Sequence, residues 1–252
     1  MPTFFVEAGA DRVGELTQIS GEDAWHMAKV LRLGRGATVT LIPEVGTECE
    51  AVLEEVTPQR VTARVLTSQR RCREPRAQLH VVQALPKGTG MAEVCERLAE
   101  LGASSIWPVL TERTIPRLED GQAQGRQRRW QRVAREAAQL ARRHRAPSVQ
   151  RPLPLADAVA SLRERERRLQ WLVCDQPTAE ASLASVRWAP DAPTALVVGP
   201  VGGLSPDELA AIRVVGGVAV SLGPRNLRTL LAASVAAVVL LQRAGDLELP
   251  RR

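Results

Sequence analysis

The sequence predicts an α/β protein in two parts, a small β-rich unit over residues 1–72 and a larger domain with a mainly parallel sheet over residues 73–252. Short segments with alternating apolar residues dominate the first part, whereas strand-like and helix-like patterns alternate in the second. A polar, basic stretch that contains Pro75 separates the two parts. With 252 residues and 44% hydrophobic composition, the chain is long and apolar enough to form a globular core.

The first part is expected to form a compact barrel with one helix. Helical spacing begins at Ser20, which forms a capping pair with Asp23, and ends at Gly34. The three alternating segments that follow are expected to be strands: ATVTLI (37–42), ECEAVLEEV (48–56) and RVTARVLT (60–67). Short strands at this regular spacing are typical of a small barrel.

The second part is expected to contain a parallel sheet covered by helices. The segments with the pattern of buried strands are 79–86, 105–110, 170–174, 194–198 and 218–222. Helices are expected at 91–101, with Gly102 as the stop, at 124–143 and at 227–242. The apolar stripe expected to pack in the middle helix consists of Trp130, Val133, Ala137 and Leu140.

The charge distribution points to a polyanionic partner. The net charge is +6 with a pI near 10.0, and all but two of the 34 basic residues are arginine. A GC-rich genome would explain the preference for arginine but not its clustering. Between Arg113 and Arg151 there are 11 arginines against three acidic residues. A solvated helix face is the alternative, but the excess favours a phosphate-binding surface. The residues expected to contact RNA are Arg113, Arg128, Arg129, Arg132 and Arg142.

Aromatic composition argues against recognition by base stacking. The chain has no Tyr, two Phe and five scattered Trp, so we expect RNA contacts mainly to phosphates and to shape.

Cysteine spacing and hydropathy exclude several classes of protein. The four cysteines form no CxxC pair and lie far from the three histidines, so neither a zinc site nor a disulfide framework is expected. The N-terminus lacks the pattern of a signal peptide. The most apolar segment, 230–241, is shorter than the roughly 20 residues of a membrane span. A cytosolic protein without membrane or metal partners is therefore expected.

Two glycine turns indicate a ligand site. In TALVVGPVGGLSPDEL (194–209) a strand leads through glycines into a helix that begins with a Ser205–Glu208 capping box and Pro206. The turn has neither Walker nor GxGxxG spacing, and alone it is explained by backbone geometry. A second strand ends similarly in SLGPRNLRTLL (221–231), with Arg225 and Arg228 nearby. Two such turns at the carboxyl ends of parallel strands predict a crevice that binds a nucleoside through main-chain groups.

Six segments, in this order, carry a resemblance to a known family: HMAKVLRLGRG from His26, LPKG from Leu85, ERLAELGASSIWPVLTERT from Glu96, REAAQLAR from Arg135, LVVGPVGGLSPDE from Leu196 and VSLGPRNLR from Val220. They cover nearly the whole chain. The sequence resembles the 16S ribosomal RNA uridine N3-methyltransferases, the ribosomal small-subunit methyltransferase E family of the SPOUT superfamily.

The resemblance implies an N-terminal PUA-like β-barrel that holds RNA and a C-terminal domain threaded into a trefoil knot. It implies a homodimer with the final helix in the interface, and S-adenosylmethionine bound in a bent form between the two glycine turns. Carried onto this chain, the cofactor-binding residues are Val198, Gly199, Pro200, Gly203, Leu222, Gly223 and Leu227.

Several positions depart from the family's pattern. Val201 stands where the family usually has Glu, Asn226 where it has an aliphatic residue, and Leu230 and Leu231 where it has Glu-Thr. In the basic helix, Leu140 replaces a Gln. The binding glycines are present, so the departures concern catalysis more than cofactor binding.

Methylation of uridine N3 requires loss of the imide hydrogen and stabilisation of negative charge on the neighbouring carbonyls. We expect Arg225 or Arg228 to supply the cation, although either would also serve as a phosphate clamp. No general base is evident, and His144 is expected to be a surface histidine. Two alternatives to an active uridine N3-methyltransferase stay open: a divergent paralogue that binds ribosomal RNA without methyl transfer, and a methyltransferase directed to another RNA.

Overall fold

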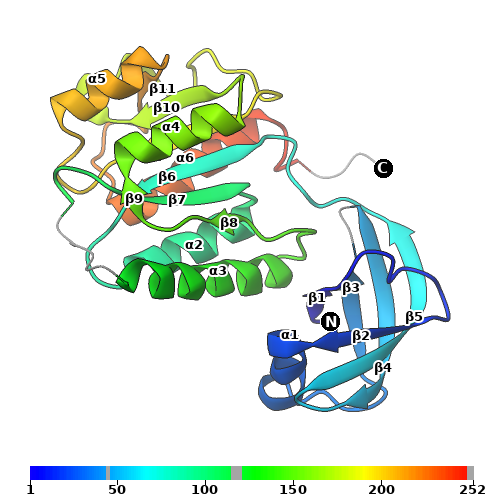
Figure 1. The fold of residues 1–252 in the computed structure, drawn as a ribbon. Coiled ribbons are helices and arrows are strands. Elements are labelled where there is room, and N and C mark those ends of the chain that lie inside the picture. The colour runs from blue at the N-terminus through cyan, green and yellow to red at the C-terminus, as the bar shows by residue number, and fades with distance from the viewer. Residues whose placement is uncertain (44–45, 115–120, 249–252) are drawn as a thin grey trace. The chain divides into compact units, whose positions relative to one another are not determined.

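The computed structural model describes residues 1–43, 46–114 and 121–248 (Figure 1). The chain divides into two compact units, one of residues 1–74 with 138–145 and one of residues 75–137 with 146–252. The division falls in the polar stretch around Pro75. Residues 138–145, which follow most of the predicted basic helix, belong to the first unit, and no local pattern in the sequence indicated this.

The first unit contains a five-stranded sheet in the order β1-β3-β4-β5-β2. Its elements are β1 (Thr3–Phe5), β2 (Leu16–Ser20), α1 (Gly21–Trp25), a π-helical turn η1 (His26–Val30), β3 (Thr38–Ile42), β4 (Thr47–Val56) and β5 (Arg60–Arg70). All pairings are antiparallel except β1 with β3. Alternate residues of β4 and β5 are buried in one apolar core, as the period-two pattern predicts.

The helix of the first unit differs from expectation. It is one α-helical turn followed by the π turn, and it ends at Val30 instead of Gly34. Ser20 occupies the cap position, but its side chain makes no capping hydrogen bond. The Asp23 carboxylate instead accepts a hydrogen bond of 3.2 Å from the side chain of Gln139.

The second unit contains a sheet in the order β11-β13-β10-β12-β6-β7-β8, with β9 beside β7, and every pairing is parallel. Its strands are β6 (Leu79–Ala84), β7 (Ser105–Leu110), β8 (Ser148–Val149), β9 (Leu153–Pro154), β10 (Gln170–Cys174), β11 (Ala181–Ser182), β12 (Thr194–Val198) and β13 (Val218–Ser221). Its helices are α2 (Gly90–Leu101), α3 (Gln122–Leu140), α4 (Leu155–Arg165), the 3-10 turn η2 (Gln176–Thr178), α5 (Pro206–Val214) and α6 (Thr229–Arg243).

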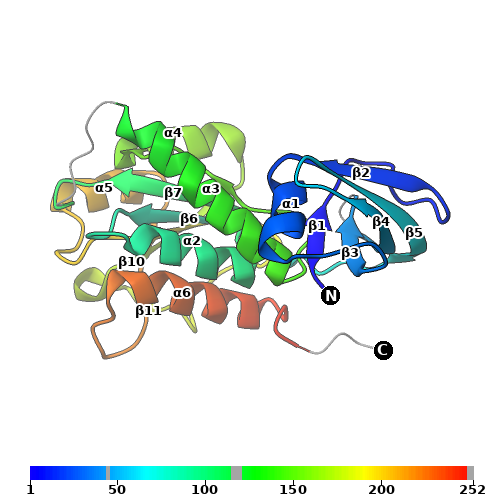
Figure 2. The same cartoon turned by 90° about the horizontal axis from the view of Figure 1, so that it is seen from below.

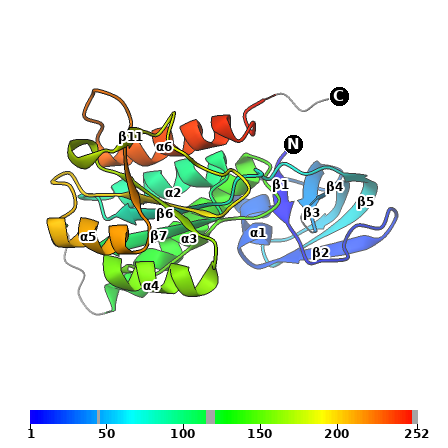
Figure 3. The same cartoon turned by 90° about the horizontal axis from the view of Figure 1, so that it is seen from above.

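Helices cover both faces of this sheet. Leu196 and Val198 of β12 belong to the core under α2, α3 and α6, whereas Ala195 and Val197 belong to the core under α4 and α5. Figure 2 shows α6 beside α2, and Figure 3 shows α4 and α5 on the opposite face from α6. The strand alternation therefore assigns successive side chains to two separate cores, which explains the continuous apolar runs in the sequence.

The predicted stripe of α3 is partly wrong. Trp130 and Ala137 are buried, and Ala134 packs with them, but Val133 is only half-buried and Leu140 is 78% exposed. The helix ends at Leu140, three residues earlier than expected. Residues 115–120, which belong to the predicted basic segment, lie outside the described residues.

Candidate functional site

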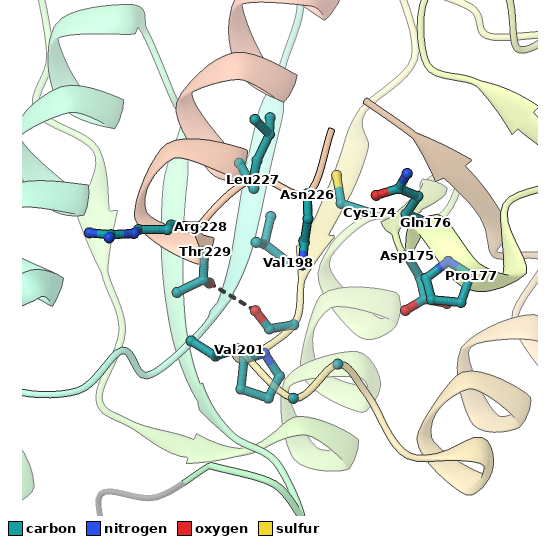
Figure 4. Close-up of a pocket in the computed structure, with 15 residues that line it drawn as sticks. Cys174, Asp175, Gln176, Pro177, Val198, Val201, Asn226, Leu227, Arg228 and Thr229 are labelled. Carbon is teal, nitrogen blue, oxygen red and sulfur yellow. Dashed lines mark hydrogen bonds between the residues drawn. The ribbon is translucent and has the colours of Figure 1, made fainter. Parts of the chain in front are cut away.

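A pocket of about 710 Å³ lies where three adjacent parallel strands end. Strand β10 lies between β12 and β13, and Cys174 is in register with Val198 on one side and Val220 on the other. Because carboxyl ends of parallel strands meet at one sheet edge, the three following loops converge there. The pocket is lined by Cys174, Asp175, Gln176, Pro177, Val198, Gly199, Pro200, Val201, Gly202, Gly203, Asn226, Leu227, Arg228, Thr229 and Ala232 (Figure 4).

The first glycine turn forms one wall. The Gly203 N–H donates a 2.9 Å hydrogen bond to the Pro200 carbonyl. Gly203 has φ +74°, a backbone conformation that residues other than Gly rarely adopt. Helix α5 then begins with both hydrogen bonds of the predicted capping box between Ser205 and Glu208. Val201, at the tip, is 80% exposed. The turn is thus held by its own backbone and by the helix it starts.

The loop after β10 forms the opposite wall, which the sequence did not predict. The Asp175 carboxylate accepts a 2.6 Å hydrogen bond from the Thr178 hydroxyl. Its other oxygen, Oδ1, lies 3.8 Å from where a Cβ on Gly203 would stand, so it faces the first glycine turn. Among the described residues, Asp175 is the one carboxylate that lines the pocket. A polar residue directly after the predicted strand 170–174 was the available signal.

Cys174 lines the same wall. Burial, reinforced by the neighbouring Asp175 charge, raises the pKa of its thiol to about 12. The thiol therefore stays protonated near neutral pH and contributes a small apolar surface in place of a nucleophile.

Thr229, the first residue of α6, connects three segments of the site. Its hydroxyl donates a 2.8 Å hydrogen bond to the Gly199 carbonyl, drawn as the dashed line in Figure 4. The same oxygen accepts a 2.8 Å hydrogen bond from the fully buried Gln83 side chain at the end of β6. Because the Gly199 carbonyl is engaged by Thr229, the first turn is fastened to the helix that follows the second turn.

The second glycine turn contributes fewer of the expected residues. Leu227, Asn226 and Arg228 line the pocket, but Leu222, Gly223 and Arg225 are not among the lining residues. Leu222 packs against the core, and Arg225 is exposed. Figure 4 shows the Arg228 side chain directed away from Asp175 and the loop after β10, so this cation does not face the opposite wall.

The arginines predicted to contact RNA occupy different environments. Arg128, Arg129 and Arg132 are exposed along α3. Arg113 donates a 2.8 Å hydrogen bond to the Gly202 carbonyl, which places it at the first glycine turn. Arg142 is exposed in the first unit.

Two basic residues of this segment are buried, which corrects their expected roles. His144 is not a surface histidine: its Nδ1 accepts a 2.8 Å hydrogen bond from the Gly46 N–H, and its Nε2 lies 3.3 Å from the Glu48 carboxylate. Arg143 pairs with Glu74 at 2.7 Å, with side-chain exposures of 3% and 5%. Arg143 therefore neutralises a buried carboxylate and adds nothing to the basic surface.

Within the described residues, no group of His, Cys, Asp or Glu side chains has the arrangement of a metal site. No helix among them is long and apolar enough to cross a membrane.

Family comparisons cover both units. A model described as an RNA methyltransferase domain matches residues 73–242, and one described as an RNA methyltransferase PUA domain matches residues 19–66. The ribosomal RNA small subunit methyltransferase E of Mycobacterium bovis is 34% identical over 92% of this chain and 88% of its own length. The Bacillus subtilis protein of the same name is 27% identical over 91% of each chain.

Two solved structures with this fold contain a cofactor. The ribosomal RNA small subunit methyltransferase E of Neisseria gonorrhoeae, bound to S-adenosyl methionine, has a TM-score of 0.82 and 27% identity over 94% of this chain and 95% of its own. A Legionella pneumophila protein in complex with SAM has a TM-score of 0.83 and 28% identity over 96% and 97%.

Proposed function

Because the chain belongs to the RNA methyltransferase family, with the SPOUT fold and an N-terminal PUA-like domain, we propose that it transfers a methyl group from S-adenosylmethionine to N3 of a uridine in 16S ribosomal RNA. The observation that carries the proposal is the pocket at the ends of β12, β10 and β13, which the first glycine turn and residues 226–229 line. We place this activity in the cytoplasm, on the small ribosomal subunit. The trefoil knot of the SPOUT fold is part of the proposal.

The pocket fits the cofactor in size and chemistry. Its volume of about 710 Å³ lies within the 300–1,000 Å³ that small-molecule sites usually have. Apolar groups of Val198, Leu227 and Ala232 offer a surface for an adenine ring. Gly203 leaves open the space that a Cβ would occupy between the turn and Asp175.

Individual roles follow from this placement. We assign cofactor contacts to Val198, Gly199, Pro200 and Gly203 along the first turn, and an apolar contact to Leu227. We assign the ribose hydroxyls to Asp175, since a carboxylate at the end of a neighbouring strand is the usual partner of a ribose in parallel sheets. Leu222 and Gly223 then support the second turn from outside the pocket lining.

The bound cofactor supplies an electrophilic methyl group on its sulfonium. The protein's part is to position the uridine for in-line attack and to stabilise the charge that develops on its carbonyls. We assign the stabilising cation to Arg228 or Arg225, because Arg228 lines the pocket and Arg225 is exposed three residues earlier. Because N3 lies on the pairing edge, the uridine must be unpaired or turned out of its helix.

The exposed arginines support RNA binding. Arg113 adjoins the first glycine turn, Arg128, Arg129 and Arg132 line the outside of α3, and Arg142 lies in the first unit. We propose that they contact phosphates. Replacing Arg128, Arg129 and Arg132 together by Gln should weaken RNA binding and flatten the slope of log K against log salt by about 0.7–0.9 per lost contact.

A homodimer completes the proposal. On α6, Leu231 and Val238 lie seven residues apart on one face of the helix and are 45% and 38% exposed. The alanines of the other face are buried. Apolar residues at this spacing suit a second copy of the helix, and such an interface would bury on the order of 2,000 Å². Leu231→Asp with Val238→Asp should give monomers in light scattering, whereas Val214→Asp, exposed on α5, should not.

A binding-only paralogue is the second candidate. Leu230, which stands where the resembling family has Glu, packs its side chain against Gly90 at the start of α2. Val201, which lines the pocket, replaces another Glu. The deciding experiment is single-turnover transfer of labelled methyl to small subunits that lack the modification. It compares the natural chain with Val201→Glu and with Leu230→Glu plus Leu231→Thr. Transfer by the natural chain supports the enzyme; transfer by restored variants alone supports the paralogue.

Mapping the product resolves the position and the RNA. Methyl label at N3 of one uridine in 16S RNA is the expected result. Label at another atom, or transfer only to another RNA, would contradict that part of the proposal.

A further inference from the structure

Trp25, the last residue of α1, is the exposed tryptophan of the first unit. Its exposure is 53%, whereas Trp107, Trp130 and Trp171 are buried in the cores of the second unit. Trp188 is half-buried under the Arg243 guanidinium. About half of the surface of Trp25 is therefore open to solvent and free to contact a partner.

Two exposed cations follow this tryptophan in the chain. Lys29, one turn beyond Trp25, and Arg32, just after the π turn, are both exposed. Among the described residues neither has a hydrogen-bonding or ion-pair partner. By contrast, Arg64 and Arg73 of the same unit pair with carboxylates at 2.6 and 2.5 Å. The cations beside Trp25 are therefore available to an external anion.

The backbone at the same place is strained. Within the described part of the chain, the non-glycine residues with positive φ are Arg32, at 51°, and Arg142, at 56°. Both are exposed arginines of the first unit, and this conformation is uncommon outside Gly, Asn and Asp. The Gln139 side chain, one turn before Arg142, donates a hydrogen bond to Asp23 of α1. Strain of this kind, together with a π turn, is frequent at functional sites.

We propose that Trp25, Lys29, Arg32 and Arg142 form a surface, the Trp25 surface, that binds an unpaired RNA strand. One base stacks on the indole, and the flanking phosphates bind the three cations. A stacked base needs a free face, so this surface selects single-stranded RNA over duplex. The proposal rests on the proposed function only in taking RNA as the substrate. The aromatic composition led us to expect RNA contacts mainly to phosphates and to shape; the Trp25 surface adds one stacking contact to these.

The test measures binding of the full chain to a labelled oligouridine and to an RNA duplex of equal length, by fluorescence anisotropy. Trp25→Ala should weaken binding of the single strand about tenfold and leave duplex binding nearly unchanged. Trp25→Phe, which keeps an aromatic face, should restore most of the affinity. Val13→Ala, at an apolar residue of the same unit with 64% exposure, is the matched control and should have no effect.

Charge variants test the phosphate contacts separately. Lys29→Gln and Arg32→Gln should each flatten the slope of log K against log salt for the oligouridine by about 0.7. Equal losses for single strand and duplex in Trp25→Ala, or losses no larger than in Val13→Ala, would overturn the proposal. A loss no larger than in Val13→Ala is the result expected if this surface binds a protein instead of RNA.

Cofactor titration separates this proposal from the proposed function. The Trp25 and Lys29 variants should bind S-adenosylhomocysteine with unchanged affinity, because none of their side chains lines the pocket. Should the natural chain bind RNA as described but fail to transfer methyl, the proposed function fails and the Trp25 surface stands.

Discussion

The Thr229 hydroxyl donates a 2.8 Å hydrogen bond to the Gly199 carbonyl, joining the start of α6 to the first glycine turn. Gln83 donates to the same hydroxyl from β6, so one side chain couples three segments that are far apart in sequence.

Thr229→Val keeps the shape but removes this hydroxyl. The Gly199 carbonyl then loses its partner, and the buried Gln83 amide loses one acceptor. We expect the free energy of unfolding to fall by about 1–3 kcal/mol and cofactor affinity to fall several-fold, measured by urea denaturation and calorimetry. Thr229→Ser should retain both. Ser234→Ala on the same helix removes a buried hydroxyl that has no hydrogen-bond partner among the described residues, and it should be nearly neutral; an equal loss there would argue against the coupling.

Gly203→Val should abolish most cofactor binding. A β-branched residue at φ +74° strains the turn, and its side chain enters the space facing Asp175. At least a tenfold loss of affinity, about 1.4 kcal/mol, is expected in titration calorimetry. Gly216→Val imposes similar strain at φ +87°, away from the pocket lining, and should leave affinity intact. Comparable losses in both variants would assign the effect to general destabilisation.

Asp175→Asn should weaken S-adenosylhomocysteine binding about tenfold, because the carboxylate held by Thr178 is expected to accept the ribose hydroxyls. Methylthioadenosine retains the ribose but lacks the amino-acid end, so its affinity should fall by the same factor. Asp207→Asn, exposed in the first turn of α5, is the control. A loss confined to S-adenosylhomocysteine would instead assign Asp175 to the ammonium group.

Glu74→Gln should destabilise the protein by about 3 kcal/mol, since it leaves the buried Arg143 uncompensated. Glu54→Gln, which breaks the half-exposed pair with Arg64, should cost about 1 kcal/mol or less. Urea denaturation near neutral pH makes the comparison. Equal effects would show that the buried pair is no more important than a surface one.

Glu74 is also expected to make the stability of the protein sensitive to acid. Burial by itself would raise the pKa of the Glu74 carboxyl, but hydrogen bonds from Arg143 and the His144 N–H outweigh it and lower the pKa. A carboxyl with a lower pKa in the folded state contributes stability above its unfolded pKa, near 4.3, and loses it as pH falls through the folded value. Below about pH 4.5, the natural chain should therefore lose stability more steeply than Glu74→Gln. Parallel curves in acid would contradict this.

Local patterns in the sequence were enough to predict β6, β7, β10, β12 and β13, the Gly102 stop of α2 and the Ser205–Glu208 capping box, but not the two-residue strands β8, β9 and β11. These features depend on residues a few positions apart, whose backbone preferences and apolar period act within one element. The two glycine turns were found for the same reason.

The composition of the pocket depended on strand order. Asp175 enters it because β10 lies between β12 and β13, and Thr229 and Gln83 meet across 146 positions of the chain. Likewise, His144 is buried against Gly46 and Glu48 because residues 138–145 belong to the first unit. No local preference encodes which distant segment supplies a hydrogen-bond partner; packing of the whole chain selects it.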